Sequence, residues 1–275
     1  MYGEGKVRRA PNYPRIVPCA IYAPGRNISQ IAIKVDNVPG ALAEVASKMT
    51  KHGINILSGL LMAEPGGEHG IIVLFLDFTN SSITVGDLVE ELRSLPMVRN
   101  ADMVVRQVGH MAIDGTTYLT TFLGDRVVVL DVMDMGAMFN WLIDTFGTGG
   151  RAILFDMGLR AGARAAKKLK EDYGLSGREL VETFLALHVA AGWFDYEITR
   201  YDEAERTFTI KLFENFECLS LRGHQPRDRP ASVLVKGVLT GIFRAAYGSD
   251  LVVDETLCIA KGDDYCEFSV KRESS

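Results

Sequence analysis

Long hydrophobic runs are missing from this chain of 275 residues. No apolar segment approaches the roughly 18 residues that a membrane-spanning helix requires, so a transmembrane protein is not expected. The first 27 residues contain four prolines but lack the apolar core of about 7 to 15 residues that marks a secretory signal. We therefore expect a soluble cytoplasmic protein, with residues 1–27 forming a flexible N-terminal arm.

Positive charge and cysteine are also scarce. The chain has 30 Lys and Arg against 35 Asp and Glu, giving a net charge of −5. This balance argues against direct nucleic-acid binding, which needs clustered basic side chains. Only four cysteines are present, at positions 19, 218, 258 and 266. Without a secretory signal, these thiols are expected in a reducing compartment, where they are free or bind metal rather than form structural disulfides.

Recognisable catalytic motifs are absent as well. The chain has no Ser-His-Asp elbow and no HExxH sequence, and its five histidines are scattered. The segment Gly147-Thr148-Gly149-Gly150 resembles a phosphate loop only superficially, because no Lys-Ser/Thr pair follows it. We therefore expect a protein without enzymatic activity.

What is present is typical of a globular protein of two domains and of the α+β class. Hydrophobic residues make up 47% and charged residues 24% of the chain, and the length suits two domains of roughly 100 to 170 residues. Within residues 28–109, period-two alternation marks four strands and helical spacing marks two helices, in the order βαββαβ. This order predicts a ferredoxin-like domain over residues 28–109.

Two stretches of this domain closely resemble the ACT family, namely Val35-Asp36-Asn37-Val38-Pro39-Gly40-Ala41-Leu42 and Lys51-His52-Gly53-Ile54-Asn55-Ile56. ACT domains are regulatory modules that usually pair through their sheets and often bind an amino acid at the interface. The resemblance implies a homodimer and an amino acid held against Asn37, Gly40 and Asn55. A helix N-terminus after a Pro-Gly turn offers N–H groups to a carboxylate, although Asn37 and Gly40 can equally serve the turn itself.

The hydrophobic pattern restarts after residue 109 and predicts a mixed α/β domain over residues 113–271. Helical spacing marks four helices, and two short strands are expected around Gly124-Asp125. The stretch 193–221 alternates like an antiparallel hairpin. Pro230 is expected to open the fourth helix from the favoured first-turn position, and two strands follow this helix.

Glycine pairs are spaced one turn apart in two of these helices. Gly158 and Gly162 lie in one helix, and Gly237 and Gly241 lie in another. Because glycine has no side chain, this spacing permits a close backbone approach or leaves room beside the helix.

Glu255, Cys258 and Cys266 lie near the end of the second domain, in a stretch that reads ETLCIAKGDDYC. Carboxylate and thiolate donors suit tetrahedral Zn²⁺. Positions three apart on a straight strand point to opposite faces, so Glu255 and Cys258 can share a metal only if the strand bulges or ends between them. The alternative is that both cysteines are small buried side chains and that Glu255 is solvated or paired.

Residues 230–268, together with Gly158, Gly162 and the segment Asn215-Phe216-Glu217, resemble the 4-vinyl reductase domain. The sensor halves of phenol- and xylene-responsive activators share this domain. The resemblance implies an antiparallel sheet covered by helices, as in transport-particle subunits, together with dimerisation and a pocket for a small hydrophobic ligand. It also implies Zn²⁺ held by a Glu and three Cys.

The earliest cysteine of that family pattern falls on Ser232 in this chain. A serine hydroxyl is a poor zinc ligand. Either Cys218, His224 or a water molecule therefore completes the coordination shell, or the site holds no metal. Cys218 is included in the predicted metal set with the three late residues.

Six aromatic residues of the second domain are candidates for lining the hydrophobic pocket. A flat apolar ligand gains most from aromatic walls and few polar contacts. The same residues could instead fill a closed core. The six are Trp141, Phe184, Trp193, Phe213, Phe216 and Phe243.

The combined interpretation is a non-enzymatic sensor. The ACT-like domain dimerises and binds an amino acid, the second domain binds a small hydrophobic or aromatic effector, and occupancy of one site shifts the other. The output is expected to pass through an unidentified partner protein, because no DNA-binding element is present. One alternative is an accessory or scaffold protein that carries a hydrophobic intermediate such as a tetrapyrrole. Another alternative is a reduction carried out at the zinc.

Overall fold

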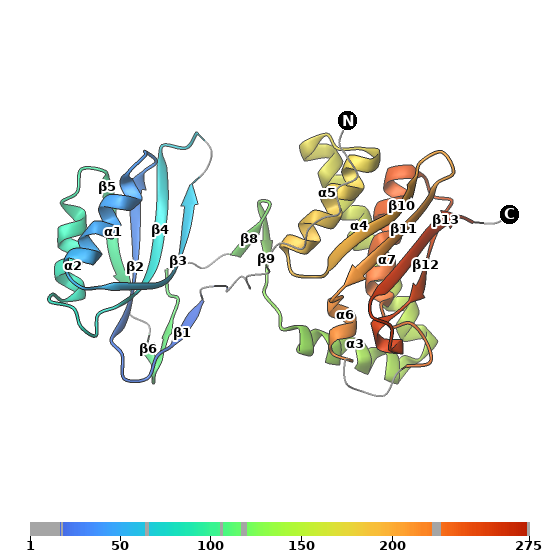
Figure 1. Ribbon diagram of the computed structural model, residues 1–275, viewed down its shortest axis with the longest axis horizontal. Coiled ribbons are helices and arrows are strands. Elements are labelled where there is room, and N and C mark those ends of the chain that lie inside the picture. The colour runs from blue at the N-terminus through green and yellow to red at the C-terminus, as the bar shows by residue number, and fades with distance from the viewer. Residues whose placement is uncertain are drawn as a thin grey trace. The chain divides into compact units, whose positions relative to one another are not determined.

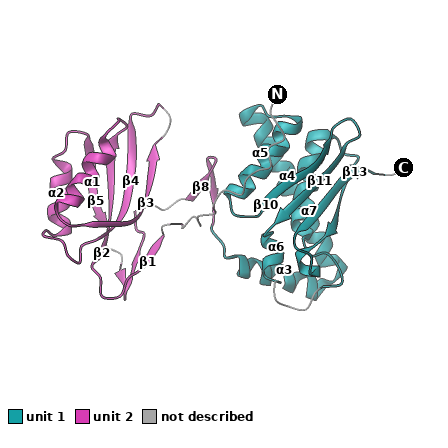
Figure 2. Cartoon of the chain, viewed as in Figure 1, with its two compact units in different colours: residues 1–8, 129–275 teal, residues 9–128 magenta. Residues whose placement is uncertain are grey.

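Two compact units make up the computed structural model of the chain (Figures 1 and 2). The division falls between Val128 and Val129, so residues 113–128, which we predicted at the start of the second domain, belong to the first unit. Each unit has its own hydrophobic core. The structure describes residues 17, 19–63, 66–104, 107–116, 120–221 and 227–273.

The first unit is a four-stranded antiparallel sheet with two helices packed on one face (Figure 1). Its strand order is β3-β4-β2-β5, and every neighbouring pair is antiparallel. This order confirms the ferredoxin-like βαββαβ prediction. The elements are β2 (Ile28–Asp36), α1 (Ala41–Lys51), β3 (Asn55–Ala63), β4 (His69–Asp77), α2 (Val85–Arg93) and β5 (Val98–Val104).

Alternating apolar residues bury the helix-covered face of this sheet. Ile31 and Ile33 of β2 are fully buried and pack in one cluster with side chains of α1 and α2. Helix α2 begins with a capping box, in which the Thr84 side chain accepts the Asp87 N–H and the Asp87 carboxylate accepts the Thr84 N–H. Local sequence signals therefore set both the strand face and the helix start.

The predicted flexible arm contains a strand. Ala20–Tyr22 (β1) pairs with Met111–Ile113 (β7), which pairs in turn with Gln107–Val108 (β6). Ala112 of β7 also packs with Phe75 in a small buried cluster of its own. Residues 20–22 differ from the prediction of an arm over residues 1–27 because β7 offers them a strand partner.

A short hairpin follows this small sheet. Its strands are β8 (Thr120–Phe122) and β9 (Asp125–Val127), and they pair in antiparallel register. Gly124 adopts a positive φ of 79° between them, which glycine tolerates without strain. The two strands expected around Gly124-Asp125 are therefore present.

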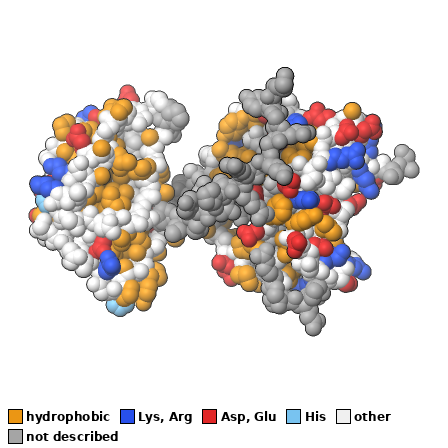
Figure 3. Space-filling model, in the orientation of Figure 1, with side chains coloured by type: hydrophobic (Ala, Val, Ile, Leu, Met, Phe, Trp, Pro, Cys, Tyr) orange, Lys and Arg blue, Asp and Glu red, His pale blue; other side chains and the backbone are white. Residues whose placement is uncertain are grey.

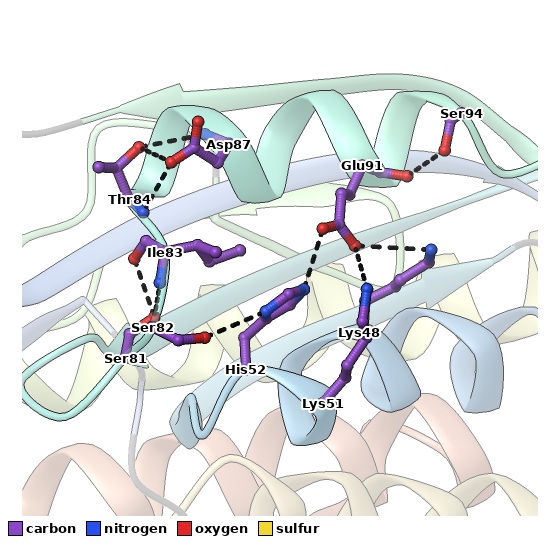
Figure 4. A network of polar contacts seen from close by, with 10 residues as sticks. All are labelled: Lys48, Lys51, His52, Ser81, Ser82, Ile83, Thr84, Asp87, Glu91 and Ser94. Carbon is purple, nitrogen blue, oxygen red and sulfur yellow. Dashed lines mark hydrogen bonds and ion pairs between the residues drawn. The ribbon is translucent and has the colours of Figure 1, made fainter.

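A polar network joins α1 to α2 (Figure 4). The His52 ring is 9% exposed and lies 3.3 Å from the Ser82 hydroxyl and 3.0 Å from a Glu91 carboxylate oxygen. Lys48 and Lys51 lie 3.6 Å from the other Glu91 oxygen. The hydrogen bond with His52 lowers the pKa of Glu91. The network gives partners to polar groups that the packing of the two helices largely removes from water.

The second unit is a four-stranded antiparallel sheet covered by helices (Figure 1). Its strand order is β10-β11-β13-β12, which confirms the predicted mixed α/β domain with an antiparallel sheet. Among the helices that the structure describes, none combines the length and apolar character needed to cross a membrane. The elements are α3 (Val132–Phe146), α4 (Thr148–Tyr173), α5 (Gly177–Ala190), β10 (Asp195–Asp202), β11 (Thr207–Phe213), α6 (Phe216–Leu219), α7 (Val233–Tyr247), β12 (Leu251–Leu257), the 3-10 turn η1 (Ile259–Lys261) and β13 (Cys266–Arg272).

Helices α4 and α7 pack with their backbones in direct contact. A Cβ atom at Gly158 would lie 2.1 Å from the Leu234 carbonyl oxygen, and one at Gly162 would lie 2.2 Å from the Val238 carbonyl oxygen. The two glycines of α7 approach the α4 backbone in the same way. The glycine pairs therefore mark a close approach rather than empty room, and their matching order shows that the two helices run in the same direction.

A short helix replaces the end of a predicted strand. The alternation over residues 193–221 predicted a strand that continues to Cys218, but residues 216–219 form helix α6. The Asn215 side chain accepts the Glu217 N–H and caps this turn. Local capping therefore overrides period-two alternation here.

Helix α7 begins later than predicted. Its first residue is Val233, not Pro230. The backbone N–H of Ala231 donates to Cys258 Sγ at 3.3 Å, which engages a non-helical segment before the helix. The contacts of residues 230–232 with the last strands therefore displace the helix start.

We expect Gly162→Ala to destabilise the second unit. Its Cβ would overlap a backbone oxygen, so the helices would have to separate, at a cost of roughly 1–3 kcal/mol in the free energy of unfolding. Gly149→Ala is a matched control in the same helix, because its Cβ would approach no neighbouring atom closer than 4.0 Å. Urea unfolding followed by circular dichroism compares the two, and equal stability of both variants would contradict the close packing.

Candidate metal centre and the pocket beside it

Four side chains with metal-binding donor atoms meet in the second unit. Cys218 lies on α6, Glu255 on β12, Cys258 directly after β12, and Cys266 at the start of β13. Their donor atoms all lie within 4.8 Å of one another, and the three thiols are fully buried. The structure thus brings together the four residues of the predicted metal set, which we call the thiol cluster. That they bind a metal stays a prediction.

The spacing of the sulfur atoms fits tetrahedral Zn²⁺. The Cys218 Sγ atom lies 3.6 Å from that of Cys258 and 3.7 Å from that of Cys266. Tetrahedral Zn–S bonds of about 2.3 Å separate the sulfur atoms by about 3.8 Å. Three thiols and a carboxylate also make up a four-donor set, the number that closes a structural zinc site.

A break in strand pairing lets residues three apart converge. The register between β12 and β13 shifts between Glu255 and Leu257, and β12 ends at Leu257. The strand therefore both bulges and ends before Cys258, as convergence requires. In the following turn the Cys258 N–H donates to the Asp263 carboxylate at 2.8 Å, and Gly262 takes a left-handed φ of 101°.

Ser232 lies inside the cluster and holds its carboxylate. The Ser232 hydroxyl donates to one Glu255 oxygen at 2.7 Å, and its N–H donates to the other at 3.2 Å. The same hydroxyl lies 3.1 Å from Cys218 Sγ and accepts the Asn215 amide at 2.8 Å. Ser232 therefore orients Glu255, while Cys218 supplies the third sulfur that position 232 lacks. His224, the other candidate ligand, lies outside the described residues.

A second buried carboxylate, that of Glu217, caps helix α7. Its two oxygens accept the N–H groups of Leu234 at 2.8 Å and Val235 at 2.9 Å, which are donors that a helix N-terminus leaves open. Burial raises the pKa of Glu217 to about 7, although these hydrogen bonds oppose the rise. The sequence analysis missed this role, and the only available signal was an acidic residue inside the segment Asn215-Phe216-Glu217.

Burial and close contact shift the pKa values of the thiol cluster. Burial, reinforced by the nearby Cys258, raises the pKa of Glu255 to about 9. Hydrogen bonding with the Cys258 and Cys266 sulfurs raises the pKa of Cys218, and hydrogen bonds from Cys218 and Cys266 lower the pKa of Cys258. One thiolate stabilised by two thiols is therefore the favoured state, and a cation bound here would displace protons.

A pocket of about 530 Å³ adjoins the thiol cluster. It lies between α4, α7 and β12, and its wall includes Ser232 and Glu255, which also form part of the cluster and its contacts. Cavities of roughly 300–1,000 Å³ are of the size that binds small molecules. Further lining residues include Ala152, Phe155, Val233, Thr240, Val252 and Val253.

The six aromatic residues predicted to line a hydrophobic pocket do not line this cavity. Trp193 and Phe213 are partly exposed and pack against neighbouring rings, and Trp141 is 63% exposed. The buried core accounts for the rest, because apolar residues at regular spacing fill the interior between sheet and helices. The members of the core, each at most 5% exposed, are Phe184, Phe216 and Phe243.

The three residues predicted to hold an amino acid do not meet within one copy of the first unit. Asn37, Gly40 and Asn55 are all exposed. Asn55 pairs with Asp77 at one end of β4, whereas the Asn37 N–H donates to the Glu68 carbonyl just before the other end. The nine residues of β4 separate these ends by about 26 Å. An amino acid that contacts both asparagines therefore needs a second copy of the chain.

A protein-family model matches the last part of the second unit. The model for the 4-vinyl reductase domain matches residues 208–272, a stretch that contains Cys218, Glu255, Cys258 and Cys266. The resemblance to this domain is confirmed over these residues. Comparison with curated protein sequences gives no match.

Three solved structures resemble parts of this chain. The phenol-responsive sensory domain of the transcription activator PoxR, solved with phenol, is 23% identical, with 54% of this chain and 77% of that chain covered and a TM-score of 0.48. A trafficking protein particle complex subunit 3 from Naegleria fowleri, covalently bound to palmitic acid, is 16% identical over 52% of this chain and 95% of that one, with a TM-score of 0.39. The ACT domain from the GTP pyrophosphokinase of Chlorobium tepidum is 17% identical over 29% of this chain and 99% of that one, with a TM-score of 0.25.

Proposed function

We propose that this protein is a non-enzymatic sensor that binds a small molecule in the pocket between α4, α7 and β12. The observation that carries the proposal is a shared wall, because Ser232 and Glu255 line the pocket and also belong to the thiol cluster or contact it. A ligand in the pocket would act on residues that a bound metal also holds. The match of the 4-vinyl reductase domain to residues 208–272 supports this assignment.

Zn²⁺ is the cation that the donor set of the thiol cluster fits best. The residues that would hold it are Cys218, Glu255, Cys258 and Cys266. Bound there, zinc would supply a fixed crosslink between α6 and the last two strands. Four protein donors leave no open position for a substrate, which is why the proposed role is structural rather than catalytic.

The coupling between pocket and cluster runs through the start of helix α7. Ser232 directly precedes this helix, and both its hydroxyl and its N–H hold Glu255. A ligand shifts the equilibrium between two arrangements of these groups only if it binds them with different affinities. The output passes through a partner protein that recognises one arrangement.

The first unit serves as the dimerisation module and contributes the amino-acid site. Figure 3 shows hydrophobic side chains gathered over the middle of one face of this unit. Exposed apolar surface of this kind is typical of protein interfaces. Pairing of two copies would bring Asn37 of one copy toward Asn55 of the other, which a single copy keeps apart. Exposed apolar residues of its strands include Leu57, Leu61, Met62 and Met103.

The purified protein is expected to contain one zinc ion per chain. Cys218→Ser removes one of four donors and should lower zinc affinity by more than the roughly 10- to 100-fold typical of outer-shell substitutions. Cys19→Ser is the matched control, because Cys19 is an exposed thiol outside the cluster. Elemental analysis with native mass spectrometry gives metal content and subunit number. Full zinc content in Cys218→Ser would show that another group completes the set.

Zinc affinity is expected to rise with pH. The pKa values of Cys218 and Glu255 are raised, the latter to about 9, so protons occupy these donors at neutral pH and must leave when zinc binds. Each displaced proton changes the affinity about tenfold per pH unit below the pKa of its group. Competition with a chromophoric chelator at several pH values measures the effect, and a pH-independent affinity would contradict it.

Ala152→Trp is expected to abolish small-molecule binding by filling the pocket. Ala152 lies on α4, lines the pocket and is exposed, so the larger side chain leaves the buried core intact. Ala161→Trp is the matched control, since Ala161 is exposed on the same helix and does not line the pocket. Thermal-shift measurements with phenols and other small aromatic compounds compare the variants. A ligand-induced shift that survives Ala152→Trp would place the ligand elsewhere.

A further inference from the structure

The pocket is an elongated groove along helix α7. Its lining residues on this helix, Val233, Lys236, Thr240 and Arg244, recur at three- and four-residue spacing and so share one face. From Val233 to Arg244 this face extends about 16 Å, at about 1.5 Å per residue. A ligand that fills the groove is therefore longer than a single aromatic ring.

Three basic side chains line the groove, and two of them have no carboxylate partner. The Lys236 Nζ atom lies 3.2 Å from the Asp254 carboxylate. Within the part of the chain that the structure describes, no carboxylate lies within 4.0 Å of the guanidinium of Arg151 or Arg244. Each guanidinium donates one hydrogen bond to a backbone carbonyl, at 2.6 and 2.7 Å respectively. Because arginine has five N–H donors, these bonds position both side chains and leave their charge uncompensated.

The two ends of the groove differ in polarity. Arg151 lies at the end where α7 starts, beside the apolar Phe155 and close to Glu255, whose carboxylate is bonded to the residue before α7. An anion at this end would face a carboxylate. Arg244 lies near the other end, one helical turn after the hydroxyl-bearing Thr240. The favourable place for a negative charge is therefore the Arg244 end.

We propose that the groove binds an amphipathic monocarboxylate, with its carboxylate at Arg244 and its apolar body toward Phe155. A guanidinium recognises a carboxylate through parallel charge-assisted N–H···O bonds. The apolar walls, which include Val252 and Val253, favour a hydrocarbon body by removing it from water. The inference rests on the proposed function, since it takes the groove as the ligand site, and it assigns that site an anion rather than a neutral phenol.

Matched probes on the full chain test the class of ligand. 4-Phenylbutyrate carries a carboxylate, and 4-phenyl-1-butanol has the same apolar body with a neutral end. Titration calorimetry is expected to show at least about tenfold tighter binding of the acid, with an advantage that shrinks as salt is added. Phenyl phosphate is the third probe, and tighter binding of the phosphate than of the carboxylate overturns the assigned class.

Substitutions test the position of the carboxylate. Arg244→Gln should weaken binding of 4-phenylbutyrate about 10- to 100-fold and leave binding of the alcohol unchanged. Arg151→Gln should change the affinity less than about threefold. Arg200→Gln is the control, since Arg200 is exposed on β10 and does not line the groove. If Arg244→Gln folds poorly by circular dichroism, Arg244→Lys decides, because it keeps the charge and loses the paired hydrogen bonds.

Each outcome separates the inference from the function on which it rests. Equal affinity for acid and alcohol, lost for both in Ala152→Trp, would overturn the anion assignment and leave the proposed function standing. Binding of neither probe would overturn both. A larger loss in Arg151→Gln than in Arg244→Gln would overturn the placement of the carboxylate at Arg244.

Discussion

The contact on which the second unit depends is the packing of α4 directly against α7. Glycines such as Gly158 and Gly162 remove the side chains that would otherwise separate the two backbones. This contact sets the position of α7, and with it Ser232 at one end of the helix and Arg244 near the other. Since α4 and α7 both contribute to the wall of the pocket, any residue that forced them apart would also reshape the groove.

The start of α7 is where buried acidic groups collect. Glu217 accepts the first N–H groups of the helix, and Glu255 accepts the N–H and the hydroxyl of Ser232. A helix N-terminus offers unsatisfied donors and a positive partial charge, so it compensates carboxylates that burial would otherwise disfavour. The thiol cluster and the groove are built against this same helix end, which is the physical basis for coupling ligand binding to metal binding.

The first unit follows a different logic, because its register spreads the candidate ligand residues along the sheet. Asn37 and Asn55 belong to opposite ends of β4, and no rearrangement of side chains can bridge about 26 Å. The polar network around His52 ties the two helices together on their own face. What this unit offers to a partner is therefore an exposed sheet surface, and a site for an amino acid depends on association of two copies.

The sequence by itself determined the order and type of most elements, because the spacing of apolar residues depends only on which face of each strand or helix is buried. It also indicated the grouping of Glu255 with Cys258, since their separation along the chain is short and one bulge suffices to join them. Only the tertiary structure decided that Cys218, which is 40 residues from Cys258 along the chain, completes the cluster. It alone also decided that Phe243 fills the core while a groove lies along another face of the same helix. Apolar spacing marks burial, but it does not distinguish a space filled by neighbouring side chains from one left for a ligand.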